Sequence, residues 1–196
     1  DLARVALGAD ERALRRLVVD GQRGGSASHG PRGYRHYLET LRAVQPPAAA
    51  DQAAIDDWAR AVLAAHGEFQ LLCGLRRGSW GVEGLNGRIA AWLQEAGLID
   101  ATEGWYAGRP VLVTRNDYDL GLMNGDIGIT LALPSVDGAP RLRVAFPAGD
   151  GRHGIKWVQP SRLQAVETVF ALTVHKSQGS EFAHGALVLP DSLSPI

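Results

Sequence analysis

The sequence predicts a mixed α/β domain that is interrupted by a small all-β unit. Residues 1 to 103 combine helical patterns with one short apolar run, whereas residues 104 to 166 contain short β-rich runs separated by turn sequences. Beyond residue 166 the apolar runs are again unbroken. Continuous apolar runs are typical of parallel strands buried on both faces, and short runs between tight turns are typical of antiparallel sheets.

The composition is that of an ordinary globular protein. The chain has 196 residues, of which 45% are hydrophobic and 21% charged, and its net charge of −1 argues against a generally basic nucleic-acid coat. Its one cysteine, Cys73, excludes an internal disulfide, and no apolar run approaches the roughly 18 residues that span a bilayer. We therefore expect a cytoplasmic protein without a membrane segment.

The two ends of the chain predict a fragment of a longer polypeptide. Residue 1 is an Asp inside a helical pattern, with no initiating Met and no signal-peptide pattern. At the other end, the sequence ALVLPDSLSPI stops just after an apolar strand, before any segment that could cover that strand.

The first 65 residues are expected to be helical. Apolar residues recur at near-helical spacing over residues 1 to 20, namely at Leu2, Val5, Leu14, Leu17 and Val18. The glycine-rich stretch GQRGGSASHGPRG then predicts a connector, and further helices are expected over about 33–44 and 52–65. The paired prolines of QPPAAAD end the first of these, and Asp51 can cap the second.

A strand, a basic loop and a helix are expected next. The run EFQLLCG predicts a buried strand that ends at Gly74, and a helix is expected over about 83–97. Between them lie Arg76 and Arg77, in a loop spaced by glycines. Loops between strands and helices are where α/β proteins place residues that contact ligands.

The all-β unit is expected to contain four strands in GRPVLVTRND, DIGITLALP, RLRVAFP and GIKWVQP. Asn124 and Gly125 form a strong tight-turn signal between the first two runs. The short PSRL at residues 160–163 resembles the single helical turn of Src-homology-3-like barrels.

Two strands are expected after this unit, over about 168–174 and 185–189. The first, VFALTV, lacks alternation and is expected to be a central strand buried on both faces. The stretch TVHKSQGSEF then places a hydroxyl, an imidazole, an ammonium and an amide at its carboxyl end, where ligands bind in open α/β sheets. From spacing alone, a solvated loop remains the alternative.

Three stretches resemble motifs of the superfamily-one helicases, most of all the RecD-like helicases, the alpha subunits of exonuclease V. TVHKSQGSEF resembles their motif V, GRPVLVTRNDYDLGLMNGDIGI resembles the segment before it, and FQLLCGLRRGSWGVEGLN resembles their motif IV. The resemblance covers about residues 66–190 in the family's order. It implies a partial second RecA-like domain of the P-loop NTPase type, over 66–103 and 167–196, with a Src-homology-3-like 2B barrel inserted over 104–166. The helical segment over 1–65, expected from its apolar spacing, leads into this domain.

The resemblance also implies site residues. In motif V it assigns DNA binding to Thr173, His175 and Lys176, and nucleotide binding to Gln178, Gly179 and Glu181. An extended segment there could touch both ligands, since its alternate side chains face opposite ways. In motif IV it assigns a catalytic arginine at the γ-phosphate to Arg77 or Arg76, and we favour Arg77, beside Gly78. In the barrel it suggests DNA contacts for Arg115, Asn116, Tyr118 and Asn124, for each of which turn formation is the alternative.

By the same resemblance, the parent protein is an ATP-dependent 5′-to-3′ DNA helicase of a RecBCD-type complex for recombination and double-strand-break repair. Its cofactor is ATP with Mg²⁺, but the chain lacks a GxxxxGK[ST] phosphate loop, so we expect the magnesium ligands elsewhere and the isolated chain to be inactive. The implied partners are single-stranded DNA, the N-terminal RecA-like domain of the same polypeptide, and RecB- and RecC-like subunits. A resident metal site is not expected, since His153 and His184 have no ligand partners at suitable spacing.

Two other readings remain open. One is a stand-alone RecD-like helicase or a conjugative relaxase-type helicase. The other is a non-catalytic nucleic-acid-binding module that uses the barrel alone.

Overall fold

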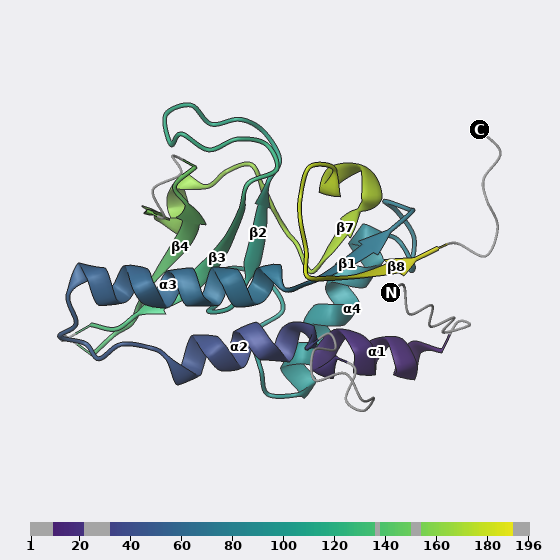
Figure 1. Ribbon diagram of the computed structural model, residues 1–196, viewed down its shortest axis with the longest axis horizontal. Coiled ribbons are helices and arrows are strands. Elements are labelled where there is room, and N and C mark those ends of the chain that lie inside the picture. Colours follow the sequence, from purple (N-terminus) through teal and green to yellow (C-terminus); the bar gives the residue numbers. More distant parts are fainter. Residues whose placement is uncertain (1–9, 22–31, 136–137, 150–153, 190–196) are drawn as a thin grey trace.

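Two sheets lie side by side, with helices packed along them (Figure 1). The computed structural model describes residues 10–21, 32–135, 138–149 and 154–189. The helices are α1 (Glu11–Asp20), α2 (Gly33–Ala43), α3 (Gln52–Gly67) and α4 (Val82–Glu95). The helices expected over 33–44, 52–65 and 83–97 are thus confirmed within a few residues. Residues 1–9 and most of the glycine-rich connector lie outside the described residues.

The smaller sheet is parallel and has β1 at its centre. Strand β1 (Phe69–Cys73) pairs on one side with β7 (Ala171–Thr173) and on the other with β8 (His184–Val188). Cys73 lies opposite Thr173 in the register, so β1 and β7 end at the same edge of the sheet. The loops that follow these two strands therefore start next to each other.

Within the described residues, the apolar run VFALTV is buried on both faces as predicted but is an edge strand and not a central one. Among the described strands β7 lies at one edge of the parallel sheet, and β1 occupies the centre. The run lacks alternation because different elements cover its two faces. Phe170 and Ala171 lie in the core formed with the helices, whereas Val169 and Leu172 pack with Leu112 of the second sheet.

The larger sheet is antiparallel, with strand order β5-β4-β3-β2-β6. It comprises β2 (Pro110–Val113), β3 (Ile127–Leu133), β4 (Arg141–Pro147), β5 (Ile155–Val158) and β6 (Val166–Thr168). The four predicted strands are confirmed, and a 3-10 turn, η1 (Pro160–Arg162), precedes β6 as the PSRL sequence suggests. The sheet continues to Thr168, two residues beyond the expected boundary at residue 166, because β6 pairs with β2.

The long loop between β2 and β3 contains its own small hairpin. Asp117 and Leu122 exchange backbone hydrogen bonds of 2.8 and 2.9 Å, and the chain reverses between them. The expected turn at Asn124 and Gly125 follows, with Gly125 at a φ of +103° that favours glycine. This turn closes the loop just before β3 and does not join the two strands directly.

Helices α2 and α3 support both sheets from one shared core. Trp58 and Val62 of α3 lie in the same buried cluster as Leu71 of β1 and Ile129 of β3. The α3 helix begins as predicted, with the Asp51 carboxylate accepting a 2.8 Å hydrogen bond from the backbone N–H of Ala54. No helix within the described ranges is long and apolar enough to cross a membrane.

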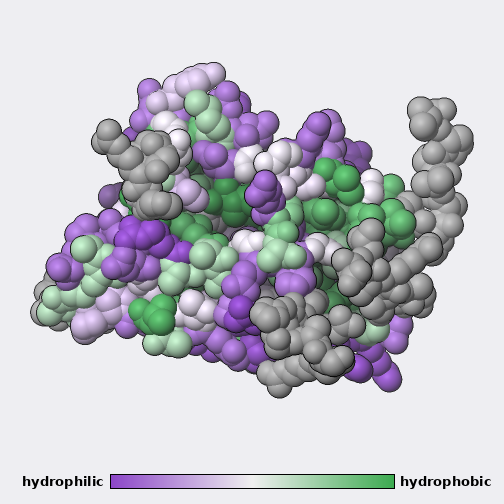
Figure 2. Space-filling model, viewed as in Figure 1, coloured by the Kyte–Doolittle hydropathy of each residue, from purple (hydrophilic) through white to green (hydrophobic). Residues whose placement is uncertain are grey.

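The surface is mixed in hydropathy, and hydrophobic residues gather around β7 and β8 (Figure 2). Leu187 of β8 and Leu189, just after this strand, are 53% and 65% exposed. Both lie at the edge of the parallel sheet.

Two tyrosines of α2 hold the two connections between the sheets. The Tyr37 hydroxyl donates a 2.8 Å hydrogen bond to the carbonyl of Gly108, where the chain enters the antiparallel sheet. The Tyr34 hydroxyl donates to the carbonyl of Phe170, where the chain leaves it. Both tyrosines are fully buried, so their hydroxyls have no alternative partner in bulk water.

Replacing Tyr37 by Phe should therefore lower the free energy of unfolding by about 1 to 2 kcal/mol, since the buried Gly108 carbonyl loses its donor. Urea unfolding followed by circular dichroism measures this change. Tyr118→Phe is the matched control, because Tyr118 is 76% exposed and its hydroxyl can bond to water. Equal effects of the two substitutions would contradict the assignment.

Candidate functional site

The loops after β1 and β7 meet at a single carboxylate. We call residues 74–81 the β1–α4 loop and residues 174–183 the β7–β8 loop. Arg76 of the first and Lys176 of the second both contact Glu167 of β6, with N–O distances of 3.6 Å each. The structure thus brings together two stretches that lie a hundred residues apart in the sequence, at the edge where α/β sheets bind ligands.

The β1–α4 loop is folded against the first turn of α4. The backbone N–H groups of Val82 and Glu83 donate to the carbonyls of Leu75 and Arg76, at 3.0 and 3.2 Å. Two donors at this helix N-terminus are therefore used within the loop. A Cβ at Gly81 would lie 2.4 Å from the Arg77 carbonyl oxygen, so only glycine allows this close approach.

Two further contacts support the start of α4. The Arg88 guanidinium lies 4.5 Å above the centre of the Trp80 ring and also donates to the Ser79 carbonyl. Below the loop, the buried Cys73 thiol lies 3.4 Å from the carbonyls of Leu75 and Leu172. Burial raises the pKa of this thiol, which favours its protonated form.

The two candidate arginines differ in their surroundings. Both are exposed, but the Arg76 guanidinium reaches the Glu167 carboxylate. Among the described residues, no hydrogen bond or ion pair of the Arg77 side chain is found. Arg77 is therefore the guanidinium that can bind an incoming anion without first leaving a partner.

The start of the β7–β8 loop is a short helical turn and not the extended segment that the sequence suggests. Thr173 begins the 3-10 turn η2 (Val174–Ser177), and its hydroxyl oxygen accepts a 3.3 Å hydrogen bond from the Lys176 N–H. The Ser177 hydroxyl donates to the Val174 carbonyl at 2.8 Å. Successive side chains therefore point in directions that rotate about the turn. The local hydrogen bonds of Thr173 and Ser177 hold the backbone in this helical form.

The second half of this loop is open. Gly179 has a φ of +87°, and nothing lies within 4 Å of where its Cβ would be. Gln178 and Glu181 are exposed, as is His175 on η2. A ligand backbone or base could thus approach the main chain at Gly179 closely.

The four candidate residues of the β2–β3 loop contact one another in part. The Asn116 side-chain oxygen accepts a 2.8 Å hydrogen bond from the Asn124 N–H, and its amide nitrogen donates to the Tyr118 hydroxyl at 3.2 Å. Asn116 thus has a local role in the turn, and Asn116, Asn124, Tyr118 and Arg115 are all exposed. No hydrogen bond or ion pair between described residues joins this loop to the other two loops.

Sequence reasoning missed two residues of this region. Glu167 is a single charge within the apolar run VETVFALTV, and that isolation is the signal that could have identified it. Asn86 faces the sheet from α4, and its side-chain oxygen accepts hydrogen bonds from the N–H groups of Phe170 and Ala171, at 2.7 and 2.9 Å. Asn86 thus fixes the segment that leads into β7.

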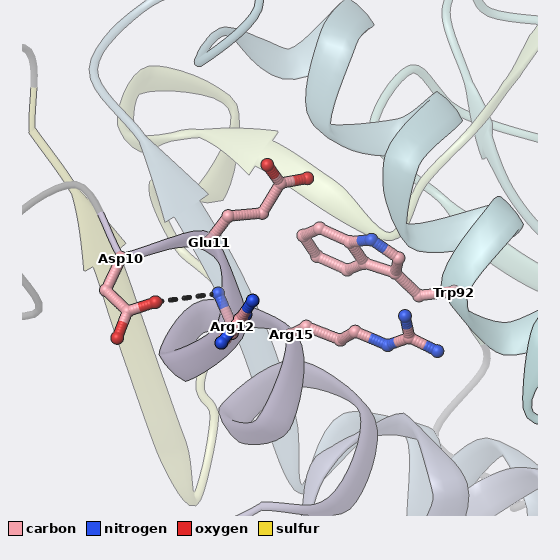
Figure 3. Close-up of a pocket in the computed structure, with 5 residues that line it drawn as sticks. All are labelled: Asp10, Glu11, Arg12, Arg15 and Trp92. Atoms are coloured by element: carbon pink, nitrogen blue, oxygen red, sulfur yellow. Dashed lines mark hydrogen bonds between the residues drawn. The ribbon is translucent and has the colours of Figure 1, made fainter.

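The hollow in Figure 3 lies elsewhere, between α1 and α4. It is lined by Asp10, Glu11, Arg12, Arg15 and Trp92. Three of its four charged side chains are already engaged, since Asp10 caps α1, Arg15 pairs with Glu95 at 2.8 Å, and Glu11 contacts Arg88 at 3.6 Å. Arg88, which contacts Glu11 of this hollow, also donates to the Ser79 carbonyl of the β1–α4 loop, whereas α1 itself lies at the bottom of the view in Figure 1.

No group of three or more His, Cys, Asp or Glu residues suited to a metal ion is found in the described parts of the chain. His184 lies in β8, and His153 lies outside the described residues.

Comparisons with known proteins give relatives of one kind. The chain is 43% identical over 155 residues to the protein named RecBCD enzyme subunit RecD of Mycolicibacterium smegmatis, which is 78% of this chain and 26% of that protein. It is 34% identical over 170 residues to the RecD subunit of Haemophilus influenzae, covering 83% of this chain and 24% of that protein. The ATP-dependent RecD2 DNA helicase of Deinococcus radiodurans is 33% identical over 132 residues, 66% of this chain and 17% of that protein. The chain spans about a quarter of the length of the RecD relatives it matches, and no family model matches it.

Proposed function

Since the chain is a homologue of one segment of the RecD helicases, we propose that it supplies half of an ATP cleft and part of the single-stranded DNA track of an ATP-dependent 5′-to-3′ DNA helicase. The observation that carries this proposal is the meeting of the β1–α4 and β7–β8 loops at Glu167. It gathers Arg76, Arg77, His175 and Lys176, the residues that match motifs IV and V, at one edge of a parallel sheet.

The fold supports this proposal at two points. We infer that the parallel sheet is part of a RecA-like domain, because its three described strands are parallel and α4 follows β1. We infer that the antiparallel unit is a Src-homology-3-like barrel. Its order β6-β2-β3-β4-β5, its long β2–β3 loop and the 3-10 turn before its last strand support this inference.

The residues present fit one side of a site for ATP with Mg²⁺. Arg77 can contact a phosphate, and the open backbone at Gly179 allows close approach of a nucleotide, with Gln178 and Glu181 beside it as hydrogen-bonding groups. The N–H groups of Val82 and Glu83 are bound by the loop before α4, and the chain has no GxxxxGK[ST] sequence, so we infer that the phosphate cradle comes from another part of the protein. Bound ATP would supply the phosphoryl group, and a guanidinium at Arg77 would stabilise the charge that develops on it.

The remaining candidates fit a nucleic-acid backbone. His175 and Lys176 can contact phosphate oxygens, and the Thr173 hydroxyl can still donate while its oxygen caps η2. On the β2–β3 loop, the exposed Tyr118 ring suits stacking on a base, and Arg115 suits a phosphate. Asn116 and Asn124 hold the loop that presents them.

By the same homology we propose that the whole protein works with RecB- and RecC-like subunits, with this chain packed against an N-terminal RecA-like domain of its own polypeptide. The RecD2 relative keeps a stand-alone helicase as a second candidate. Co-purification of the complete protein with RecB- and RecC-like subunits would separate the two.

The 196-residue chain alone should show no ATP turnover above background, because it lacks a phosphate-loop sequence. Phosphate release from the purified chain, with and without oligo-dT, measures this. Turnover that is abolished by Arg77→Ala in the same chain would contradict the half-site assignment.

The test of the function itself uses the complete protein. It should separate a duplex with a 5′ single-stranded tail in the presence of ATP and Mg²⁺, and a duplex with a 3′ tail much less. DNA binding that survives Arg77→Ala and His175→Ala unchanged, without any ATP hydrolysis, would favour the non-catalytic binding module instead.

A further inference from the structure

We propose that Glu167 is a positioning residue that holds Arg76 and Lys176 between ligands and is replaced there by a phosphate group when a ligand binds. The proposal rests on the proposed function. It concerns a residue outside the stretches that match motifs IV and V. Glu167 belongs to the antiparallel sheet, yet its carboxylate contacts cations from both loops of the parallel sheet.

The register fixes where this carboxylate lies. Glu167 pairs with Leu112 of β2, between Val166 and Thr168, which pair with Val113 and Val111. Because β6 is hydrogen-bonded to β2, Glu167 is held by a strand and not by a mobile loop. Each carboxylate oxygen contacts a different cation: Oε1 lies 3.6 Å from the Arg76 guanidinium, and Oε2 lies 3.6 Å from the Lys176 ammonium.

This arrangement resembles the way a phosphate would bind. A carboxylate and a phosphate both present anionic oxygens to a guanidinium and an ammonium, and a phosphate offers more oxygens and more charge. Arg76 and Lys176 would otherwise face each other as two like charges, which favours an anion between them. Glu167 thus keeps both cations at the mouth of the site when no ligand phosphate is present.

The pairing is weak enough to be exchanged. The side chains of Arg76, Glu167 and Lys176 are 66%, 47% and 33% exposed, so water screens both ion pairs. Both N–O distances exceed those of good charge-assisted hydrogen bonds, which lie near 2.7 to 2.9 Å. A ligand phosphate that comes closer can therefore take over either cation, and β6 then loses one link to the parallel sheet.

The experiment is Glu167→Gln in the complete protein, which keeps the shape of the side chain and removes the competing charge. Affinity for oligo-dT without nucleotide and affinity for a non-hydrolysable ATP analogue without DNA are titrated separately. We expect about threefold to tenfold tighter binding of at least one of the two, because two exposed ion pairs no longer compete. The ligand whose affinity rises identifies the source of the phosphate.

Two comparisons separate this role from a structural one. If DNA supplies the phosphate, the gain in affinity from Glu167→Gln should disappear when Lys176→Gln is also present. If the nucleotide supplies it, the gain should disappear when Arg76→Gln is also present. The effects of substitutions at residues in contact are not additive. Glu103→Gln is the matched control, an exposed carboxylate in another loop, and should leave both affinities unchanged. Unchanged or weaker binding of both ligands by the Glu167→Gln protein would overturn the proposal.

A second readout does not depend on helicase function. Lys156 and Lys176 are the lysines of this chain, so reaction with an amine-reactive reagent can be followed at each by mass spectrometry. Lys176 should react about two to five times faster in the Glu167→Gln protein, while Lys156, which donates to the Gly121 carbonyl, serves as the internal reference. If the wild-type protein binds neither ligand, the proposed function fails. Equal reaction rates of Lys176 in the wild-type and Glu167→Gln proteins would overturn the role of Glu167, whether or not the protein binds DNA or nucleotide.

Discussion

Replacing Arg77 by Ala in the complete protein should slow ATP hydrolysis by about 10³-fold or more while weakening ATP binding by less than about tenfold. A guanidinium at the γ-phosphate acts mainly on charge that develops in the transition state, and such arginines contribute roughly 10³ to 10⁵ in rate. Steady-state hydrolysis gives the rate, and titration with an ATP analogue gives the affinity. Arg77 is exposed and no partner of its side chain is found among the described residues, so thermal melting should not change.

Arg76→Ala is the matched control, since it removes the same group one residue away in the same loop. Arg76 is engaged with Glu167, so we expect a smaller effect on the rate from its loss. A large loss of rate with Arg76→Ala and none with Arg77→Ala would move the catalytic assignment to Arg76. Equal losses of rate and affinity with Arg77→Ala would indicate an arginine that only binds.

The sequence predicts the elements of this fold better than their pairing. Apolar spacing places the helices and the described strands other than β6, because it is a local property of each segment. The run VETVFALTV shows the limit, since its first residues pair with β2 and its later residues with β1, without a turn residue between them. The position of β7 at the sheet edge is likewise hidden, because contacts with Leu112 make it as apolar as a central strand.

The candidate site divides in the same way. Motif order identifies the two loops, and the structure shows that both begin at one edge of the sheet. The local form of the β7–β8 loop could not be foreseen, because the hydrogen bonds of Thr173 and Ser177 create a helical turn where strand spacing suggests an extended chain. Glu167 could not be found as a partner of Arg76 and Lys176, since no spacing rule connects three segments that meet only in the folded chain.

The two halves of TVHKSQGSEF should serve different ligands. His175→Ala in the complete protein is expected to weaken single-stranded DNA binding about tenfold or somewhat more at modest salt, because a charge-assisted phosphate hydrogen bond contributes roughly 1 to 3 kcal/mol. ATP binding without DNA should stay nearly unchanged. Gln178→Ala and Glu181→Ala should do the reverse. Separate titrations of DNA and nucleotide on each variant give both affinities.

The structure changes the physical reason for this division. The expected alternation of side chains along an extended segment is absent, because residues 174–177 form η2. A chain reversal takes its place, since the Ser180 N–H donates to the Ser177 carbonyl at 3.0 Å and Gly179 has a positive φ of 87°. His175 lies before this reversal, whereas Gln178 lies within it and Glu181 after it. If all three variants lost both affinities together and melted early, the stretch would be a packing element. If none lost either affinity, it would be a solvated loop.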